Sequence, residues 1–319
     1  MLLIVFKWLF ILGIIAGIFG GAAVYGYVAS IVKEEPVRSP DLIYDTIQQN
    51  TVTGYVFFRD GTEVGQLRGI NRELVERLED VPQIIQDAVL AVEDHDFYKH
   101  FGINLKGLLR AVKERVLNEE VQTGGSTITQ QVARNTFLSL ERTTSRKVKE
   151  ILLAIRLERV LTKKEILLAY LNKVPFGNGS NGYNVYGIKA AAKGIFDVDN
   201  LHDLNIAQAA YLAGLPQDPT DYSAFDGYGR FDEEGFQNAM NRQKTVLYRM
   251  YVTGKITREQ YEEALAFDIR GSLAESKPKA YTTYPFLMIE AEREAAEILL
   301  KQKNPELTEE ELRSKEFAP

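Results

Sequence analysis

Residues 82–94 read PQIIQDAVLAVED, and this stretch decides the fold class. Its apolar side chains recur at helical spacing and form one stripe, made by Ile84, Ile85, Ala88, Val89 and Val92. Pro82 suits the opening of a helix, because the first turn tolerates a residue without an N–H group. The stretch therefore predicts an amphipathic helix that buries one face.

Apolar side chains recur at the same helical spacing along most of the chain beyond this helix. It predicts helices at residues 105–117, 127–138, 145–161, 163–171, 204–214, 237–250 and 257–266. Upstream, residues 54–67 (GYVFFRDGTEVGQL) carry aromatic and β-branched side chains on both sides of Asp60-Gly61, a pattern that predicts a β-hairpin. We therefore expect a mainly α fold with at most one small sheet.

Composition limits the classes of function. The 319 residues are 45% hydrophobic and 26% charged, which leaves room for one large domain with an anchor and an appendage. The chain has no cysteine, so disulfides, thiolate metal sites and a cysteine nucleophile are excluded. Three histidines make a zinc enzyme unexpected, and a formal net charge of −6 argues against a nucleic-acid partner.

The N-terminus carries a long apolar run. Residues 8–32, 25 in all, include no charged side chain. At about 1.5 Å per residue this run can cross a bilayer of roughly 30 Å. A cleavable signal peptide is the alternative, although its apolar part is usually shorter and Val28-Ala29-Ser30 is a poor cleavage site. We expect a single-pass anchor followed by a juxtamembrane linker at residues 33–53.

A first cluster of reactive side chains lies at residues 93–102 (EDHDFYKHFG), where the helix at 82–94 ends. Two adjacent carboxylates at a helix C-terminus face an unfavourable dipole. Burial or a neighbouring carboxylate would raise a carboxyl pKa there, which suits a general base. The competing interpretation is a solvated helix end with Phe97 packed beneath it. Taken alone, this cluster favours the second interpretation.

A second cluster lies at residues 124–131 (GGSTITQQ). Two glycines followed by Ser126 predict a loop and a helix cap, where unpaired backbone N–H groups favour anions such as phosphate. An ordinary capped helix fits the pattern equally well.

The basic stretch 142–150 (RTTSRKVKE) likewise fits either an anion-binding face or a salt-bridged surface helix. Residues 164–196 begin with the helix predicted at 163–171 and continue into a glycine-rich loop with Gly177, Gly179, Gly182 and Gly187. This stretch matches no dinucleotide or P-loop motif, and the loop is expected to be structural and to pack over the domain.

Taken together and in this order, these segments resemble the glycosyltransferase family 51 domain. That domain is the peptidoglycan glycosyltransferase module of class A penicillin-binding proteins and of monofunctional transglycosylases. The matching segments are EDHDFYKHFG, GGSTITQQ, RKVKE, KEILLAYLNKVPFG, AQAAYLAGLPQDPTDYS and NRQKTVLYRMYVTGKIT. They cover roughly residues 80–265, and several ordered motifs are far more specific than any one of them.

The resemblance implies a lysozyme-like, mainly α domain at residues 54–268, set against the membrane and held outside the cytoplasm by residues 1–32. The implied reaction is hexosyl transfer that polymerises lipid II into β-1,4-linked glycan, with undecaprenyl pyrophosphate as the leaving group. Implied partners are lipid II, the nascent strand, membrane lipid and cell-division or elongation proteins, with no organic cofactor.

The resemblance also implies roles for individual residues. Glu93 matches the catalytic base, and Glu150 matches a second essential glutamate near the leaving pyrophosphate, where a divalent cation (Mg²⁺ or Mn²⁺) is a candidate ligand. Substrate-binding positions are expected at Asp94, Phe97, His100, Ser126, Thr127, Gln130, Gln131, Arg134, Arg142, Arg146, Lys147 and Thr220. The chain departs from the pattern of many members at residues 195–197 and at Gln217, and neither departure involves the two glutamates.

The C-terminal residues 269–319 resemble the linker that precedes a serine transpeptidase. Two S-x-x-K matches, at Ser30 and Ser276, are chance, because no K-T-G or S-x-N motif occurs. We therefore expect the N-terminal portion of a bifunctional protein whose transpeptidase is absent from this chain. Two other functions stay open: a lytic muramidase of the same fold, and a membrane-tethered scaffold without catalysis.

Overall fold

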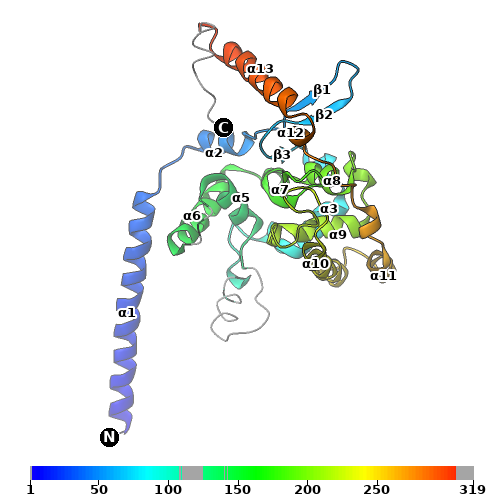
Figure 1. The fold of residues 1–319 in the computed structure, drawn as a ribbon. Coiled ribbons are helices and arrows are strands. Elements are labelled where there is room, and N and C mark those ends of the chain that lie inside the picture. Colours follow the sequence, from blue (N-terminus) through cyan, green and yellow to red (C-terminus); the bar gives the residue numbers. More distant parts are fainter. Residues whose placement is uncertain (1, 108, 110–124, 140, 142, 307–319) are drawn as a thin grey trace. The chain divides into compact units, whose positions relative to one another are not determined.

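The computed structural model describes residues 2–107, 109, 125–139, 141 and 143–306 (Figure 1). The chain forms two compact units. The first unit comprises residues up to 49 and residues 96–170, and the second comprises residues 50–95 and those from 171 onward. Helices dominate both units, which confirms the mainly α class predicted from the sequence.

The first unit begins with helix α1 (Leu2–Glu34), drawn in dark blue in Figure 1. Its stretch Val5–Lys33 is the one helix in the described part of the chain that is long and apolar enough to cross a membrane. After α1, the hydroxyl of Ser39 accepts the N–H of Leu42 at 3.2 Å and caps helix α2 (Pro40–Gln48).

Helices α5 (Ile128–Phe137) and α6 (Thr144–Val160) pack against each other in the first unit, which also contains α7 (Lys163–Lys173) up to Tyr170. Threonine hydroxyls cap the first two: Thr127 accepts the N–H of Gln130, and Thr143 accepts that of Arg146, both at 3.1 Å. The core side chains at the α5–α6 contact include Ile128, Val132, Leu153 and Leu157.

The second unit is built on helices α3 (Gln83–Glu93), α9 (Ile206–Gly214) and α10 (Glu233–Val252), which pack against one another (Figure 1). The amide of Gln243 on α10 donates to the carbonyl of Ala207 on α9 at 2.8 Å. The other helices of the unit are α8 (Ile188–Phe196), α11 (Arg258–Ala266), α12 (Ala280–Thr283) and α13 (Pro285–Lys303). Short 3₁₀ turns occur at Leu78–Asp80, Leu201–Asp203, Leu215–Gln217 and Arg270–Ser272 here, and at Phe97–Lys99 in the first unit.

The β-hairpin predicted at residues 54–67 is confirmed. Strands β1 (Tyr55–Phe57) and β2 (Glu63–Gln66) pair antiparallel. Gly61 takes a positive φ of 87° in the turn, where the carboxylate of Asp60 accepts the N–H of Thr62 at 2.9 Å.

A second small sheet shows that the expectation of at most one was wrong. Strands β3 (Asn71–Arg72), β4 (Pro175–Asn178) and β5 (Asn184–Tyr186) lie in the order β3-β5-β4, with β3 parallel and β4 antiparallel to β5. Gly177 has a φ of 85°, and a Cβ there would lie 2.5 Å from the carbonyl oxygen of Pro219. The glycine-rich loop is thus a packed β-hairpin at residues 175–186, and its pairing with β3 joins segments more than a hundred residues apart.

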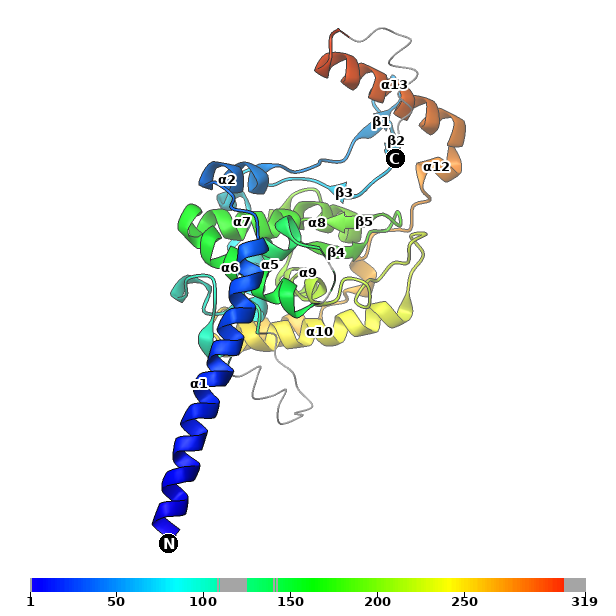
Figure 2. The same ribbon diagram turned by 90° about the vertical axis from the view of Figure 1, so that its left-hand side faces the viewer.

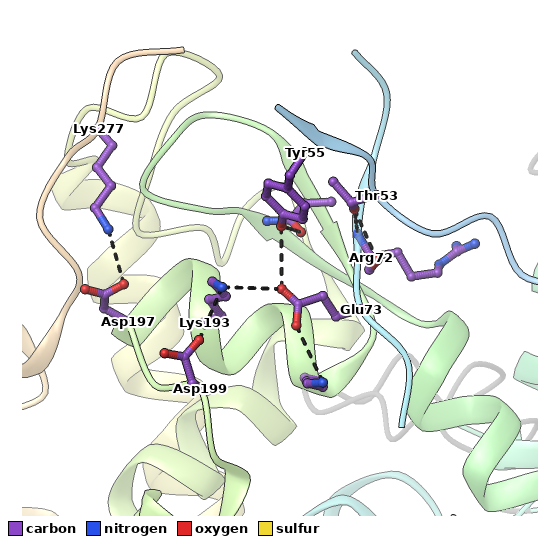
Figure 3. A network of polar contacts seen from close by, with 10 residues as sticks. Thr53, Tyr55, Arg72, Glu73, Lys193, Asp197, Asp199 and Lys277 are labelled. Atoms are coloured by element: carbon purple, nitrogen blue, oxygen red, sulfur yellow. Dashed lines mark hydrogen bonds and ion pairs between the residues drawn. The ribbon is translucent and has the colours of Figure 1, made fainter. Parts of the chain in front are cut away.

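Side-chain contacts fasten the N-terminal hairpin to helix α8. In Figure 3 the carboxylate of Glu73 accepts the hydroxyl of Tyr55 at 3.5 Å and lies 3.8 Å from the ammonium of Lys193. The same ammonium lies 3.2 Å from the carboxylate of Asp199. Burial, and next the charge of Glu73, raises the pKa of Tyr55 well above its ordinary value.

Helices α12 and α13 lie beside the β1–β2 hairpin in both ribbon views (Figures 1 and 2). The hydroxyl of Tyr281 accepts the backbone N–H of Arg68 at 3.2 Å and donates to Glu292 at 2.8 Å. A Cβ on Gly65 would lie 2.4 Å from the Cβ of Ala280, so the strand approaches α12 as closely as glycine allows. The residues expected to be a linker therefore begin with structure that belongs to the second unit.

Candidate active site

Glu93 is the last residue of α3, and its side chain is 11% exposed. One of its carboxylate oxygens lies 3.5 Å from the Nη2 atom of Arg242 on α10. An ion pair of this kind uses Glu93 as a carboxylate, which is the form that can accept a proton. Asp94 follows as the C-terminal cap of the helix and is buried.

Neighbouring helices hold this end of α3 in place. The Nη1 atom of Arg249 donates to the carbonyl oxygen of Val92 at 2.7 Å, which satisfies one of the free carbonyls of the helix end. A Cβ on Gly214 would lie 2.9 Å from the side chain of Arg242, so the glycine leaves room for that arginine. Arg242 was not among the predicted site residues, although it lies in the last of the matching motifs.

In the first unit, Lys147 joins Ser126 to Glu150. Its ammonium donates to the hydroxyl of Ser126 at 2.7 Å and pairs with the carboxylate of Glu150 through a short contact. Glu150 is 1% exposed, whereas Lys147 is partly open to solvent. A cation whose one side neutralises a buried carboxylate and whose other side reaches solvent is suited to bind an anion such as a phosphate.

The start of α5 is fixed next to Ser126. Thr127 and Gln130 form a reciprocal capping box, in which the Gln130 amide oxygen accepts the N–H of Thr127 at 3.0 Å. The hydroxyl of Thr127 also donates to the carbonyl of Gly102 at 2.7 Å. Gln131 is buried one residue further along α5. Thr127 and Gln130 therefore act on the backbone, which makes them positioning residues in this structure.

Phe97 and His100 shape the loop that follows. Phe97 is fully buried, its ring stands edge-on to that of His100 at 6.2 Å, and the ammonium of Lys163 lies 4.4 Å from its centroid. The Nδ1 atom of His100 accepts the N–H of Gly102 at 3.2 Å. A Cβ on Gly102, whose φ is 98°, would lie 2.8 Å from the carbonyl oxygen of Ala154, so this loop approaches α6 closely.

Glu158 links three of these segments and was not predicted. One of its carboxylate oxygens accepts the hydroxyl of Thr129 on α5 and the ammonium of Lys163 at the start of α7, both at 2.6 Å. The same ammonium lies over the ring of Phe97. Its signal in the sequence was an acid one turn after Ala154, next to the buried side of α6.

The remaining predicted residues lie on α5, on α6 and in the second unit, or outside the described residues. Arg134 is half-buried on α5, and its Nε atom donates to Asn135 at 3.3 Å. The Nε atom of Arg146 on α6 is buried and has no hydrogen-bond partner. Thr220 is exposed in a turn of the second unit. Arg142, Gly124 and most of the helix predicted at 105–117 lie outside the described residues.

The predicted residues thus form two separate sets, one in each unit. Glu93 and Asp94 belong to the second unit, whereas Glu150 and the residues around Ser126 belong to the first. The pairing of Glu93 with Glu150 stays a prediction. Within the described ranges, no three histidine or acidic side chains gather as a metal site would require.

Comparisons with known proteins agree with these motifs. A family model described as "Transglycosylase" matches residues 60–251. Penicillin-binding protein 1A of Clostridium perfringens (strain 13) is 36% identical over 263 residues, which are 81% of this chain and 37% of that protein. The proteins of the same name from Pseudomonas aeruginosa and Escherichia coli K12 are each 35% identical, over 92% and 81% of this chain and 33% and 28% of their own.

A solved structure, that of penicillin-binding protein 1A from Haemophilus influenzae, is also similar. It has 23% sequence identity and a TM-score of 0.44, and the match covers 76% of this chain and 24% of that chain. The chain spans about a third of the length of the curated relatives it matches.

Proposed function

This chain belongs to the transglycosylase family, and from that premise we propose that it polymerises lipid II into β-1,4-linked peptidoglycan strands. The observation that carries the proposal is the ammonium of Lys147, held between Ser126 and the buried carboxylate of Glu150 beside the start of α5. This arrangement offers positive charge to a departing pyrophosphate, and stabilisation of developing charge is usually the largest catalytic contribution.

The proposed reaction is an inverting displacement. The carboxylate of Glu93 takes the proton from the 4-hydroxyl of the acceptor sugar while that oxygen attacks the anomeric carbon of the donor. The new bond to the acceptor oxygen forms as the bond to the undecaprenyl pyrophosphate oxygen breaks. Because attack comes from the face opposite the α-linked leaving group, the product is β-linked, as in an inverting glycosidase with a sugar in place of water.

Cations of the first unit would receive the leaving pyrophosphate. The described basic side chains among the predicted substrate contacts are Lys147, Arg146 and Arg134, and Arg142 is proposed to join them.

The ion pair between Arg242 and Glu93 supports a further role: we propose that Arg242 orients the base. Asp94, Phe97 and His100 are proposed to shape the acceptor side, with Thr220 and Gln131 as further substrate contacts. Thr127 and Gln130, which cap α5, are proposed to position its start for the substrate.

A polymerisation assay with lipid II tests this function. We expect Glu93→Gln to lower the rate of polymer formation by a factor of about 10³ at unchanged fold, because general bases contribute about 10²–10⁴-fold. The matched control is Glu76→Gln, which removes an exposed carboxylate from the same unit. Unchanged turnover in the Glu93 variant would refute the assignment of the base.

The same preparation separates the alternative functions. Incubation with finished peptidoglycan would release fragments from a lytic muramidase, whereas a polymerase leaves it intact. A scaffold would turn over neither substrate. The family match and the cationic cluster at Lys147 support the polymerase, since cleavage of a glycosidic bond between sugars expels no pyrophosphate.

A divalent cation is a separate proposal. Mg²⁺ is often bound by one or two carboxylates together with substrate phosphates. Glu150 alone, with Lys147 already beside it, does not form a resident metal cage. We propose that Mg²⁺ or Mn²⁺, where the reaction uses it, enters with the pyrophosphate and contacts Glu150. EDTA treatment followed by metal titration of wild type and Glu150→Gln tests this point.

Helix α1 supports a place in the cell membrane. We propose that it spans the bilayer once and leaves the catalytic part outside the cytoplasm, where cell-division or elongation proteins are proposed partners. The chain has no cysteine, so single-cysteine variants report topology cleanly. Glu275→Cys should react with a membrane-impermeant maleimide on intact cells, whereas Lys7→Cys should react only after lysis; the reverse pattern would overturn the orientation.

A further inference from the structure

A pocket of about 580 Å³ lies within the first unit between residues 37–44 and the C-terminal half of α6. We call it the juxtamembrane pocket. Its lining includes Arg156 and Arg159 from α6, and Ile43 and Tyr44 from α2. Apolar and cationic side chains thus line one cavity, a combination that suits an amphiphile with a negatively charged head.

The juxtamembrane pocket lies on the face of α6 opposite the predicted catalytic residues. At about 100° per residue, Arg159 is rotated by half a turn relative to Glu150. Lys149, on the pocket side, lies 3.5 Å from the carboxylate of Glu35, which directly follows α1. Lys147, on the other side, contacts Ser126. Helix α6 therefore presents one basic face to the candidate active site and another to the end of the apolar helix.

The cations of this pocket are incompletely paired. Arg156 carries a buried Nη1 atom with no hydrogen-bond partner, and Arg159 is exposed. Arg38 differs, since its guanidinium pairs with Glu35 and lies 5.2 Å from the ring centroid of Phe137. The pocket lining holds one carboxylate, that of Asp41, and Glu35 pairs with Arg38, so three arginines against two carboxylates leave the pocket positive. A buried donor without an acceptor is costly, and a bound anion would satisfy it.

The position along the chain indicates the source of that anion. The apolar stretch of α1 ends at Lys33, and the pocket begins at Val37, whose side chain is 92% exposed. Tyr44 is another exposed side chain at the pocket, and aromatic residues favour the headgroup level of a bilayer. Basic residues directly outside a span attract anionic lipids.

We propose that the juxtamembrane pocket binds the phosphodiester headgroup of an anionic phospholipid. Arg156 and Arg159 contact the phosphate, and the upper part of an acyl chain lies against Val37 and Tyr44. The proposal rests on α1 being a membrane span, as in the proposed function, but it concerns a face of α6 that the glycosyl transfer does not use. The lipid would tie α2 and α6 to the membrane surface.

The full chain in nanodiscs tests the lipid site. Native mass spectrometry compares retention of phosphatidylglycerol with that of phosphatidylcholine, and we expect a preference of about tenfold for the anionic lipid in wild type. Arg156→Gln with Arg159→Gln should abolish this preference, and Arg159→Gln alone, at an exposed position, should reduce it. The matched control, Arg59→Gln with Arg258→Gln, removes the same charge from the second unit and should keep it.

Three outcomes would overturn the proposal. They are equal retention of the two lipids by wild type, an unchanged preference in the double variant, and release of the lipid by inorganic phosphate, which would indicate a site for free anions. Polymerisation of lipid II in detergent keeps the proposed function separate. We expect the double variant to retain it, so loss of the lipid preference with full polymerisation bears on the pocket alone.

Discussion

At the scale of single residues, Lys147 is the cation on which the buried carboxylate of Glu150 depends. Removal of one partner from a buried ion pair leaves an uncompensated charge. Lys147 keeps some contact with water, which screens the pair, so we expect Lys147→Met to lower the free energy of unfolding by about 2 kcal/mol, less than for a fully buried pair.

Urea denaturation of Lys147→Met, Glu150→Gln and the double variant measures this effect. Glu150→Gln should cost less than Lys147→Met, because it leaves no buried charge behind. The double variant should recover part of the loss caused by Lys147→Met. Strictly additive losses would show that the two side chains do not interact.

Lys173 supplies a prediction about pH. Burial, and next the charge of Arg72, lowers the pKa of Lys173 from 10.5 to about 8. Between these values the unfolded chain binds more protons than the folded chain, so the contribution of Lys173 to the free energy of unfolding rises with pH through this window. Below it, the ammonium is charged in both states and its burial is a constant penalty.

We therefore expect Lys173→Met to stabilise the fold near neutral pH and to lose that advantage at about pH 10. Because the ammonium is partly exposed, the gain should be about 1 kcal/mol, below the value for full burial. Urea denaturation at both pH values measures it, with Lys244→Met as the exposed control from the same unit. A gain that does not change with pH would contradict the role of burial.

Residue types predicted part of the candidate site. Ser126, Lys147 and Glu150 do meet, because a helix brings residues three apart to one face and the loop before α5 ends beside it. Arg242 and Glu158 were missed, because their partners Glu93, Thr129 and Lys163 come from other helices. Single-sequence periodicity tells which side chains are buried, not which of them meet across elements.

At the scale of elements, Glu158 joins α5, α6 and the start of α7. Its carboxylate holds Thr129 and Lys163, and Lys163 in turn covers the ring of Phe97. Displacement of these segments would misplace the loop at Phe97 and the start of α5 together. We expect Glu158→Gln to lower kcat for lipid II polymerisation about tenfold with little change in KM, since a small misplacement of reacting groups slows turnover.

Initial rates over a range of lipid II concentrations give kcat and KM separately. Glu158→Asp, which keeps the charge, should recover part of kcat. Thr245→Ala, on the exposed face of α10, serves as a control for a lost hydroxyl contact. A Glu158 variant with reduced stability but full kcat would show a merely structural role.

The elements predicted best are those whose signal lies within one short stretch of the sequence. The helices at 127–138, 145–161 and 257–266 coincide closely with α5, α6 and α11, because an apolar stripe and a capping threonine mark each one. The sheet β3-β5-β4 could not be predicted, since its strands are two to four residues long. Asn71 pairs with Val185, and no short window contains both.

At the scale of the whole molecule, the question is what the apolar helix contributes to turnover. Most of the described side chains of α1 are exposed, and Ile31, near the end of the helix, is buried. Deletion of residues 2–30 therefore removes few contacts of the folded units. A tethered enzyme meets a membrane-bound donor at a higher effective concentration than a free one does.

We accordingly expect this deletion to lower the polymerisation rate at least about tenfold with lipid II in vesicles. In detergent micelles, where the donor is no longer held in a bilayer, the rates of the truncated and full chains should converge. Circular dichroism of both proteins checks that the remaining helices are intact. An equal loss of activity in micelles and in vesicles would mean that α1 supports the fold or the reaction itself, because an anchor acts only where there is a membrane to hold.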